Sequence, residues 1–117
     1  MNPIDGGATR AVEQALRGLA LRGEVRAHNV ANLNTPGFRA RDVDFQAALR
    51  TAVATGTTDR MAAPQVVAGN GLPDASGNTV DLETEMVGMM KDQLLRDAMV
   101  NAFNFKAAIT RAAITAR

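Results

Sequence analysis

The chain has 117 residues, of which 46% are hydrophobic and only 3% aromatic, and its formal net charge is +1. This length suits one domain, and the hydrophobic fraction excludes a polar disordered tail. Small and flexible aliphatic side chains must supply most of the buried area, so the core should be shallow. We therefore expect the chain to gain stability from assembly.

Charge and residue types exclude several functional classes. Basic and acidic residues are scattered along the chain, without the basic block that nucleic-acid-binding proteins use, so we expect no nucleic-acid partner. The absence of cysteine excludes disulfides, cysteine-ligated zinc and cysteine nucleophiles. His28 is the single histidine, which is too few for an ordinary zinc site.

The sequence has no membrane-spanning or secretory pattern. No run of about 20 apolar residues is present, so no transmembrane helix is expected. Asp5, Arg10, Glu13 and Arg17 interrupt the region where a secretory signal would be apolar. If the protein leaves the cytoplasm, it needs an export route that cleaves no such signal.

A flexible lead is expected over residues 1–7, and a long helix is predicted over residues 8–33. Gly18 and Gly23 each cost about 1 kcal/mol relative to Ala inside a helix, so we expect them to permit close helix–helix approach. The apolar or small positions recur at spacings of three and four, close to a coiled-coil seam. These positions are Val12, Leu16, Leu19, Gly23, Ala27 and Val30.

The predicted helix stops in a segment of turn-forming residues that runs from Asn32 to Phe38. Asn tolerates the left-handed conformation at a helix end. Thr35 precedes a proline and is pushed toward an extended conformation. Pro36 and Gly37 suit the two central positions of a type II turn. On backbone preferences alone, this segment is predicted to be an ordinary helix end followed by a tight turn.

A turn and a short helix are predicted over residues 34–54, and a flexible loop over residues 55–78. Asp42 or Asp44 can cap the short helix. Its apolar stripe comprises Phe45, Ala48, Leu49, Ala52 and Val53. Gly, Pro, Thr, Asn and Asp break any helix in the following stretch, which leaves room for a short strand or hairpin around residues 65–67.

A second long helix is predicted over residues 81–116. Asp81, Glu83 and Glu85 place negative charge at its start, where the helix dipole favours it. The main apolar stripe comprises Leu82, Met86, Met90, Leu94, Ala98, Ala102, Phe105, Ile109 and Ala112. A second apolar flank includes Leu95 and Met99. Because one partner helix cannot cover both, we expect neighbouring subunits to cover the remainder.

Candidate catalytic groups do not combine into a site. Residues two apart on a helix do not face each other, so Glu83 and Glu85 form no acid–base pair. Ser76 is the single serine, and the segment 69–71 lacks the lysine and the following helix of a phosphate-binding loop. We expect no enzyme activity, cofactor, metal or small-molecule substrate.

Two segments resemble axial proteins of the bacterial flagellar rod and hook. In that family an N-terminal helix runs into Ala-Asn-x-x-Thr-Pro-Gly and an aromatic residue. This chain has the pattern from Ala31 to Phe38, and the residues expected to form an assembly motif are Ala31, Asn32, Asn34, Thr35, Pro36, Gly37 and Phe38. Residues 39–45 look like the continuation found in a proximal rod member, and residues 77–86 resemble the start of its C-terminal helix. The resemblance covers about residues 27–49 and residues 77–117.

The resemblance implies an all-α fold in which the N- and C-terminal helices pair as a coiled coil, with a short middle helix and an irregular loop. It implies a proximal-rod subunit that polymerises through its terminal helices, transmits torque and lines the export channel. Such a subunit is exported unfolded by the flagellar type III apparatus and resides in the periplasmic rod. Its partners would be further copies, other rod subunits, and components of the membrane ring and export gate. The residues expected to pack are Val12, Leu16, Leu19, Val30, Leu82, Met86, Met90, Leu94, Phe105 and Ile109.

Three alternatives stay open. The first is another axial protein of the distal rod or hook, although these often carry a folded insertion between their helices. The second is a helical adaptor or export chaperone, which should be a stable bundle before it meets its partner. A rod subunit should instead have frayed termini as a free monomer. The third is a nucleic-acid binder that uses Phe38, Arg39 and Arg41, whose affinity would depend on salt.

Overall fold

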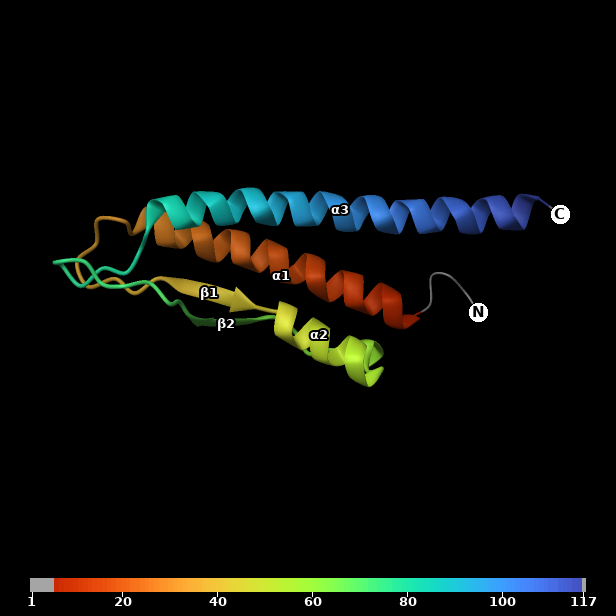
Figure 1. Ribbon diagram of the computed structural model, residues 1–117, viewed down its shortest axis with the longest axis horizontal. Helices are drawn as coiled ribbons and strands as arrows, with labels where there is room; N and C mark the ends of the chain where they lie inside the picture. Colours follow the sequence, from red (N-terminus) through yellow and green to blue (C-terminus); the bar gives the residue numbers. More distant parts are fainter. Residues whose placement is uncertain (1–5, 117) are drawn as a thin grey trace.

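The computed structural model describes residues 6–116, and the molecule is elongated, with extents of 67 × 26 × 16 Å (Figure 1). The expected lead over residues 1–7 lies mostly outside this range. Along the described chain the helices are α1 (Gly6–Ala31), α2 (Gln46–Thr55), the short 3₁₀ helix η1 (Thr58–Arg60) and α3 (Leu82–Thr115). The strands are β1 (Arg41–Asp44) and β2 (Gln65–Ala68).

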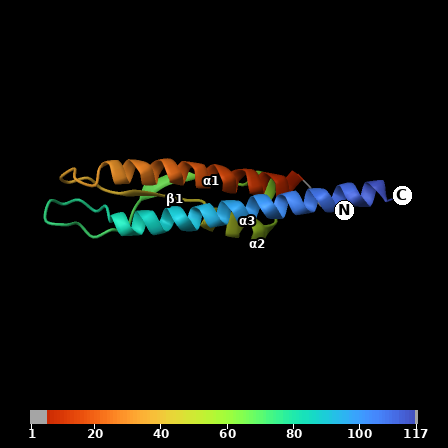
Figure 2. The ribbon, with the colours of Figure 1, turned by 90° about the horizontal axis from the view of Figure 1, so that it is seen from above.

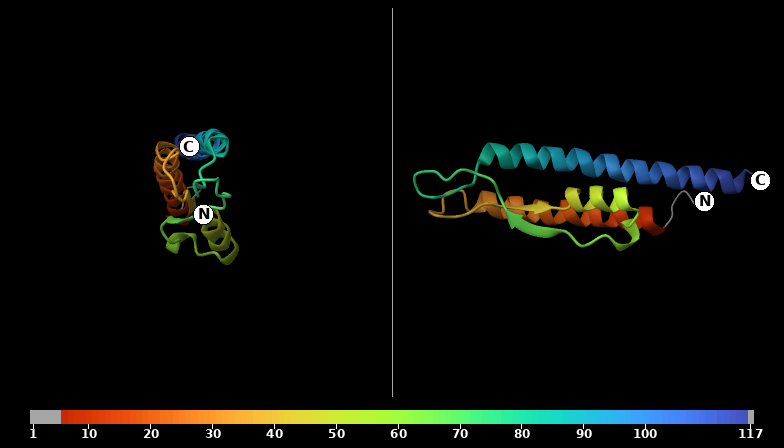
Figure 3. Two further views of the ribbon diagram at one scale, coloured as in Figure 1. Left: turned by 90° about the vertical axis from the view of Figure 1, so that its left-hand side faces the viewer. Right: turned by 60° about the horizontal axis from the view of Figure 1, so that its bottom comes forward.

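The two long helices lie side by side and run in opposite directions (Figures 1 and 2). The segment formed by β1, β2 and α2 packs on another side of α1, so that α1 lies between this segment and α3 when the molecule is viewed along its length (Figure 3). The C-terminal part of α3 extends past the start of α1 (Figure 1). None of the helices in residues 6–116 has both the length and the apolarity needed to cross a membrane.

The fold is mostly helical, and the expectation of an all-α chain is corrected by a small antiparallel sheet. β1 pairs with β2 in the register that places Arg41 opposite Ala68 and Asp44 opposite Gln65. The short strand for which the predicted loop left room around residues 65–67 is observed as β2, whereas β1 replaces part of the predicted turn. β1 has the sequence Arg-Asp-Val-Asp, of which only Val43 is buried. One apolar residue gives no alternating pattern for sequence reasoning to detect.

The turn after α1 has the predicted geometry. The Phe38 N–H donates to the Thr35 carbonyl at 3.2 Å, and Gly37 has a φ of +74°. A type II turn requires a positive φ at its third residue, so the prediction for Pro36 and Gly37 is confirmed. The Thr35 hydroxyl also donates to Asn32 Oδ1 at 3.1 Å, which ties the turn to the end of α1.

The apolar core is small and lies where α1 meets the end of β1. It comprises Ala15, Leu19, Val43 and Phe45, with Leu21, Val25, Leu95 and Met99 packed against it. The Phe45 ring occupies the space in which a side chain at position 18 would sit. Gly18 therefore admits an aromatic ring from the strand–helix junction, whereas close helix–helix approach was expected there. Nothing lies within 4 Å of a Cβ built at Gly23.

A side-chain cap fixes the start of α3, whereas the N-cap residue of α2, Phe45, makes no side-chain hydrogen bond to its helix. The Asp81 carboxylate accepts from the backbone N–H groups of Glu83 and Thr84, at 3.1 and 3.5 Å, which satisfies donors that the helix leaves free. Asp44 Oδ1 accepts from the Ala47 N–H at 3.4 Å, at the start of α2. Asp42, the other predicted cap, instead accepts from the Val43 N–H at 2.7 Å.

Candidate assembly surface and motif junction

The two segments that carry the sequence motifs, residues 31–38 and 77–86, meet in space although they are far apart along the chain. Asn78 is only 2% exposed, and its Nδ2 donates to the carbonyls of Asn32, Leu33 and Thr35 at 2.9, 3.2 and 2.7 Å. These carbonyls follow the last turn of α1, where the helix itself supplies no donor. Asn78, which lies in the segment before α3, therefore provides a hydrogen-bond donor to the carbonyls that follow α1.

Backbone hydrogen bonds extend this junction on both sides of Asn78. The Gly37 N–H donates to the Ser76 carbonyl at 2.9 Å, and the Thr79 N–H donates to the Phe38 carbonyl at 3.0 Å. The Thr79 hydroxyl accepts from the Ala40 N–H at 2.7 Å. The two motifs are therefore two halves of one structural unit, which we call the motif junction, residues 31–40 and 76–81.

A compact turn leads into the motif junction. Asp74 Oδ1 accepts from the Ser76 hydroxyl and N–H, at 2.7 and 2.8 Å, and from the Asn78 N–H at 3.1 Å. The hydrogen bonds from Ser76 lower the pKa of Asp74, with Asn78 contributing in the same direction. Because the pKa of Asp74 is lower in the folded state, these hydrogen bonds stabilise the fold at pH values above the ordinary pKa of the carboxyl group. This stabilisation is lost as the pH falls through the folded-state pKa.

Charged side chains, and not aliphatic ones, occupy part of the contact between α1 and α3. The Nε and Nη2 atoms of Arg22 donate to the two oxygens of Asp92, at 3.2 and 2.9 Å. Arg26 Nε donates to Asp92 Oδ2 at 3.0 Å, and Arg26 Nη1 donates to Glu85 Oε2 at 3.3 Å. Two guanidinium groups thus face two carboxylates, and their charges balance.

Asn29 completes this group of residues and joins it to the sheet. It is fully buried, and its Nδ2 donates to Glu85 Oε1 at 3.1 Å and to the Arg41 carbonyl at 2.8 Å. Its Oδ1 accepts from the Arg41 N–H at 3.1 Å. We call this group the polar seam: Arg22, Arg26, Asn29, Glu85 and Asp92.

Burial and neighbouring charges have opposite effects on the pKa of Arg26 in the polar seam. Burial by itself would lower the pKa of Arg26, but hydrogen bonds and charge from Asp92, with a smaller contribution from Glu85, more than offset it and raise that pKa. Arg26 fits because the guanidinium occupies the space that a side chain at Gly88 would fill. A buried ion pair is retained only where such hydrogen bonds compensate for lost hydration.

Sequence reasoning missed the polar seam, although a signal was present. Arg22, Arg26 and Asn29 recur at spacings of four and three, which places them on one face of a helix. Glu85, Gly88 and Asp92 recur at three and four on the other helix. Glu85 was expected to place negative charge at the helix start, and it does lie in the first turn of α3. What the sequence did not indicate is that the residue is 6% exposed and bonded to α1.

The residues expected to pack divide into two groups. On α1, Leu19 is buried and Val12, Leu16 and Val30 are half-buried. The six predicted positions on α3 are exposed on the single chain, by fractions between 39% and 70%: Leu82, Met86, Met90, Leu94, Phe105 and Ile109. On the single chain this stripe does not join α3 to α1, because the polar seam, Leu95 and Met99 occupy the face of α3 that meets α1.

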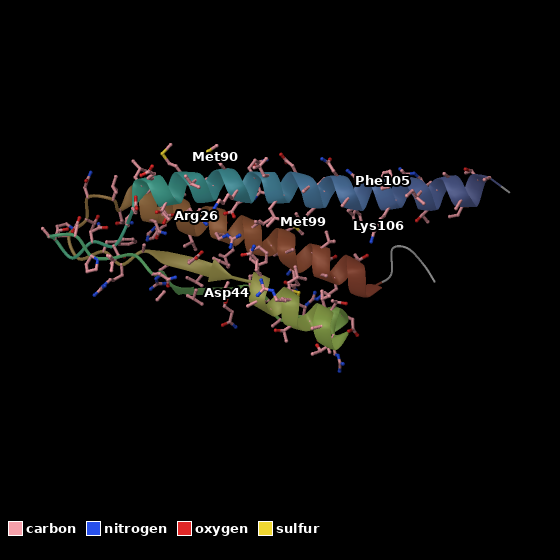
Figure 4. All side chains as sticks on the ribbon, viewed as in Figure 1. Arg26, Asp44, Met90, Met99, Phe105 and Lys106 are labelled. Carbon is pink, nitrogen blue, oxygen red and sulfur yellow. The ribbon has the colours of Figure 1, made fainter. Side chains whose placement is uncertain are left out.

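The exposed apolar residues of α3 gather on the side away from α1. At 3.6 residues per turn, Asp92 and Met99 lie about opposite Met90 around the helix. Figure 4 shows Met90 on the far side of α3 and Met99 between the two helices. We call the outward group the outer stripe, and its residues are Met86, Met90, Leu94 and Phe105, exposed by 56%, 68%, 70% and 66%.

Neither clefts nor acidic clusters in the described chain point to a reaction. In residues 6–116 no group of three or more His, Asp or Glu side chains is placed to hold a metal ion. An open cleft lies beside β1, lined by residues that include Arg26, Gly71 and Glu85. Arg26 and Glu85 already pair with each other there, so neither charge is available to a ligand without breaking the seam.

Comparison with known proteins gives a consistent set of relatives, although no family model matches the chain. The flagellar basal body rod protein FlgB of Yersinia ruckeri is 32% identical over 114 residues, which cover 80% of this chain and 82% of that protein. FlgB of Aeromonas hydrophila is 33% identical over 108 residues, covering 80% and 82%. FlgB of Escherichia coli K12 is 29% identical over 117 residues, covering 83% and 85%.

Proposed function

The chain belongs to the FlgB family of flagellar basal-body rod proteins, and we propose that it is a structural subunit of the proximal rod that polymerises through its terminal helices. The observation that carries this proposal is the outer stripe, an exposed apolar row on a helix of 34 residues. Exposed apolar patches of this kind mark surfaces that another protein covers. In a rod protein those partners are further axial subunits.

The terminal helices of neighbouring subunits would then pack as coiled coils through the outer stripe, while the polar seam holds each chain together. Such a wall of helices would transmit torque along its length and surround the channel through which later subunits pass. The side-by-side packing of α1 and α3 supports this proposal, because each chain would then contribute two long helices to the wall (Figure 1).

The motif junction would shape the end of this helix pair. Asn34, Pro36 and Gly37 are exposed there, whereas Asn78 is buried beneath them. We propose that the buried part holds the turn and that the exposed part contacts the next subunit. The assembly motif would then act through a fixed backbone shape, with Ala31, Asn32 and Thr35 supporting it and Phe38 held against the His28 ring at a centroid distance of 5.6 Å.

The proposed location is the periplasmic rod of the basal body, reached by type III export without a cleaved signal. The proposed partners are other rod subunits, further copies of this chain, and components of the membrane ring and the export gate. An enzyme activity is not part of the proposal, because the relatives carry the name of a rod protein.

Deleting the gene and complementing it with the intact chain tests the proposal. We expect loss of swimming and basal bodies that keep their membrane rings but lack rods and hooks, with both defects repaired by the intact chain. Normal swimming and intact rods in a strain without a second copy of the gene would overturn it. A helical adaptor would then be the better account, and basal bodies with a rod that lacks only its distal part would favour a distal axial protein.

A further inference from the structure

The contact between α1 and α3 has two parts that differ in how strongly they fix alignment. In one part Leu95 and Met99 pack against the core cluster that includes Ala15 and Leu19 of α1. Flexible aliphatic side chains repack at small cost when neighbouring helices shift. In the other part, two guanidinium groups meet two carboxylates in a single hydrogen-bonded arrangement.

The geometry at Asp92 is the most restrictive element of that arrangement. Arg22 meets both carboxylate oxygens in a two-point contact, and Arg26 adds a third hydrogen bond to the same group. A two-point contact between guanidinium and carboxylate fixes orientation as well as distance. A slip of α3 by one turn, about 5.4 Å, would separate every one of these pairs.

We infer that the polar seam is the register determinant of this chain: it fixes how far α3 lies along α1 and which face of α3 turns outward. A shifted alignment would leave buried charges without partners, which is strongly unfavourable even where the correct pairing adds little net stability. The seam therefore acts chiefly against wrong alignments.

Asn29 extends the same control to the sheet. Its side chain bonds to both the N–H and the carbonyl of Arg41 while it also bonds to Glu85. The strand β1 is thereby placed relative to the same two helices. One group of residues thus sets the relative positions of three elements, and the direction in which the outer stripe faces follows from it. The inference concerns alignment within one chain and holds whatever partner covers that stripe.

Distances between spin labels on the two helices test this inference, and the absence of native cysteine makes the labelling specific. Labels at cysteines introduced at Ala20 and Met86 form one pair, and labels at Ala27 and Ala98 form another. All four positions are exposed. In the first pair the α3 label lies nearer to the motif junction than the α1 label, and in the second pair the α3 label lies farther from it. A slip of α3 therefore lengthens one distance and shortens the other, by about 5 Å per turn at most.

The decisive variant replaces the four seam charges with apolar residues and leaves Asn29 in place: Arg22→Leu, Arg26→Met, Glu85→Leu and Asp92→Leu. We expect the helical circular dichroism signal to persist and each distance distribution to split or broaden into more than one population. Single distributions unchanged from those of the parent chain would overturn the inference, because apolar packing alone would then set the register.

A second variant and a control keep the test decisive. If the apolar variant fails to fold, the uncharged variant Arg22→Gln, Arg26→Gln, Glu85→Gln and Asp92→Asn is measured in the same way, with the same two outcomes. Failure of both to fold would overturn the inference, because the seam would then be needed for folding itself. The control removes two basic and two acidic exposed charges from the same helices, and its distances should not change: Arg17→Ala, Glu24→Ala, Lys91→Ala and Asp97→Ala.

Discussion

The two opposite faces of α3 differ in a way that is unusual for a helix. The face toward α1 carries Glu85 and Asp92, whose side chains are 8% and 12% exposed. The face away from α1 carries the outer stripe, in which Met90 is 68% and Leu94 is 70% exposed. An amphipathic helix in a monomeric protein normally has the reverse arrangement.

This difference separates two kinds of contact within one helix. Paired charges hold the chain in a single alignment, since they are costly to misplace. Apolar surface adds most of the free energy of association and requires less exact geometry. Because charges supply part of the contact within the chain, the apolar residues of the outer stripe are available for contacts with other molecules. The arrangement suits a subunit that is only marginally stable alone and gains stability when it assembles.

Removing one carboxylate from the polar seam should give the largest effect. Asp92→Leu leaves Arg22 and Arg26 buried with a major partner missing, so we expect a loss of about 3–5 kcal/mol in the free energy of unfolding. Urea denaturation followed by circular dichroism measures it. The matched control is Asp97→Leu, an exposed acid on the same helix bonded only to Gln93, which should change stability by about 0.5 kcal/mol or less. Equal effects of the two substitutions would contradict the account of the seam.

Breaking the motif junction should have the next largest effect. Asn78→Ala removes a buried side chain that donates to three carbonyls. The Asn32 and Thr35 carbonyls still accept from the N–H groups of Thr35 and Phe38, whereas the Leu33 carbonyl loses its donor from Asn78, and an unsatisfied buried group costs about 1–3 kcal/mol. We expect lower stability and faster amide exchange at Gly37 and Thr79, whose N–H groups bond across the junction. Asn70→Ala, in an exposed loop position, serves as the control. Unchanged exchange at both amides would show that the junction does not depend on Asn78.

Straining the turn should have a smaller effect on stability. Gly37→Val places a branched side chain at a φ of +74°, which costs about 1–2 kcal/mol, and the altered turn should prevent incorporation into rods. Gly23→Ala is the control, because open space surrounds that helical position and Ala should raise stability by about 0.5–1 kcal/mol. Normal swimming of cells that carry only the Gly37→Val chain would refute the role of the turn.

The sequence predicts the elements with local signals and misses those that depend on distant partners. The turn at Pro36 and Gly37 was predictable because each residue has its own backbone reason to be there. β1 was missed because Val43 is its only buried residue, and it is placed by β2 and by Asn29 from another element. The apolar pattern of α3 also did not indicate which of its two flanks meets α1. Periodicity locates an apolar stripe but does not say whether its partner belongs to the same chain.

The central claim is that the outer stripe serves contacts between subunits and not the fold of one chain, and the double variant Met90→Gln, Leu94→Gln tests it most directly. Its purified monomer should unfold within about 0.5 kcal/mol of the parent chain, because both side chains are solvated. In cells that carry only this variant, isolated basal bodies should lack rods, whereas Leu72→Gln, at a position 90% exposed in a loop, should give normal rods. Normal rods with the double variant, or a monomer that no longer folds, would contradict the claim.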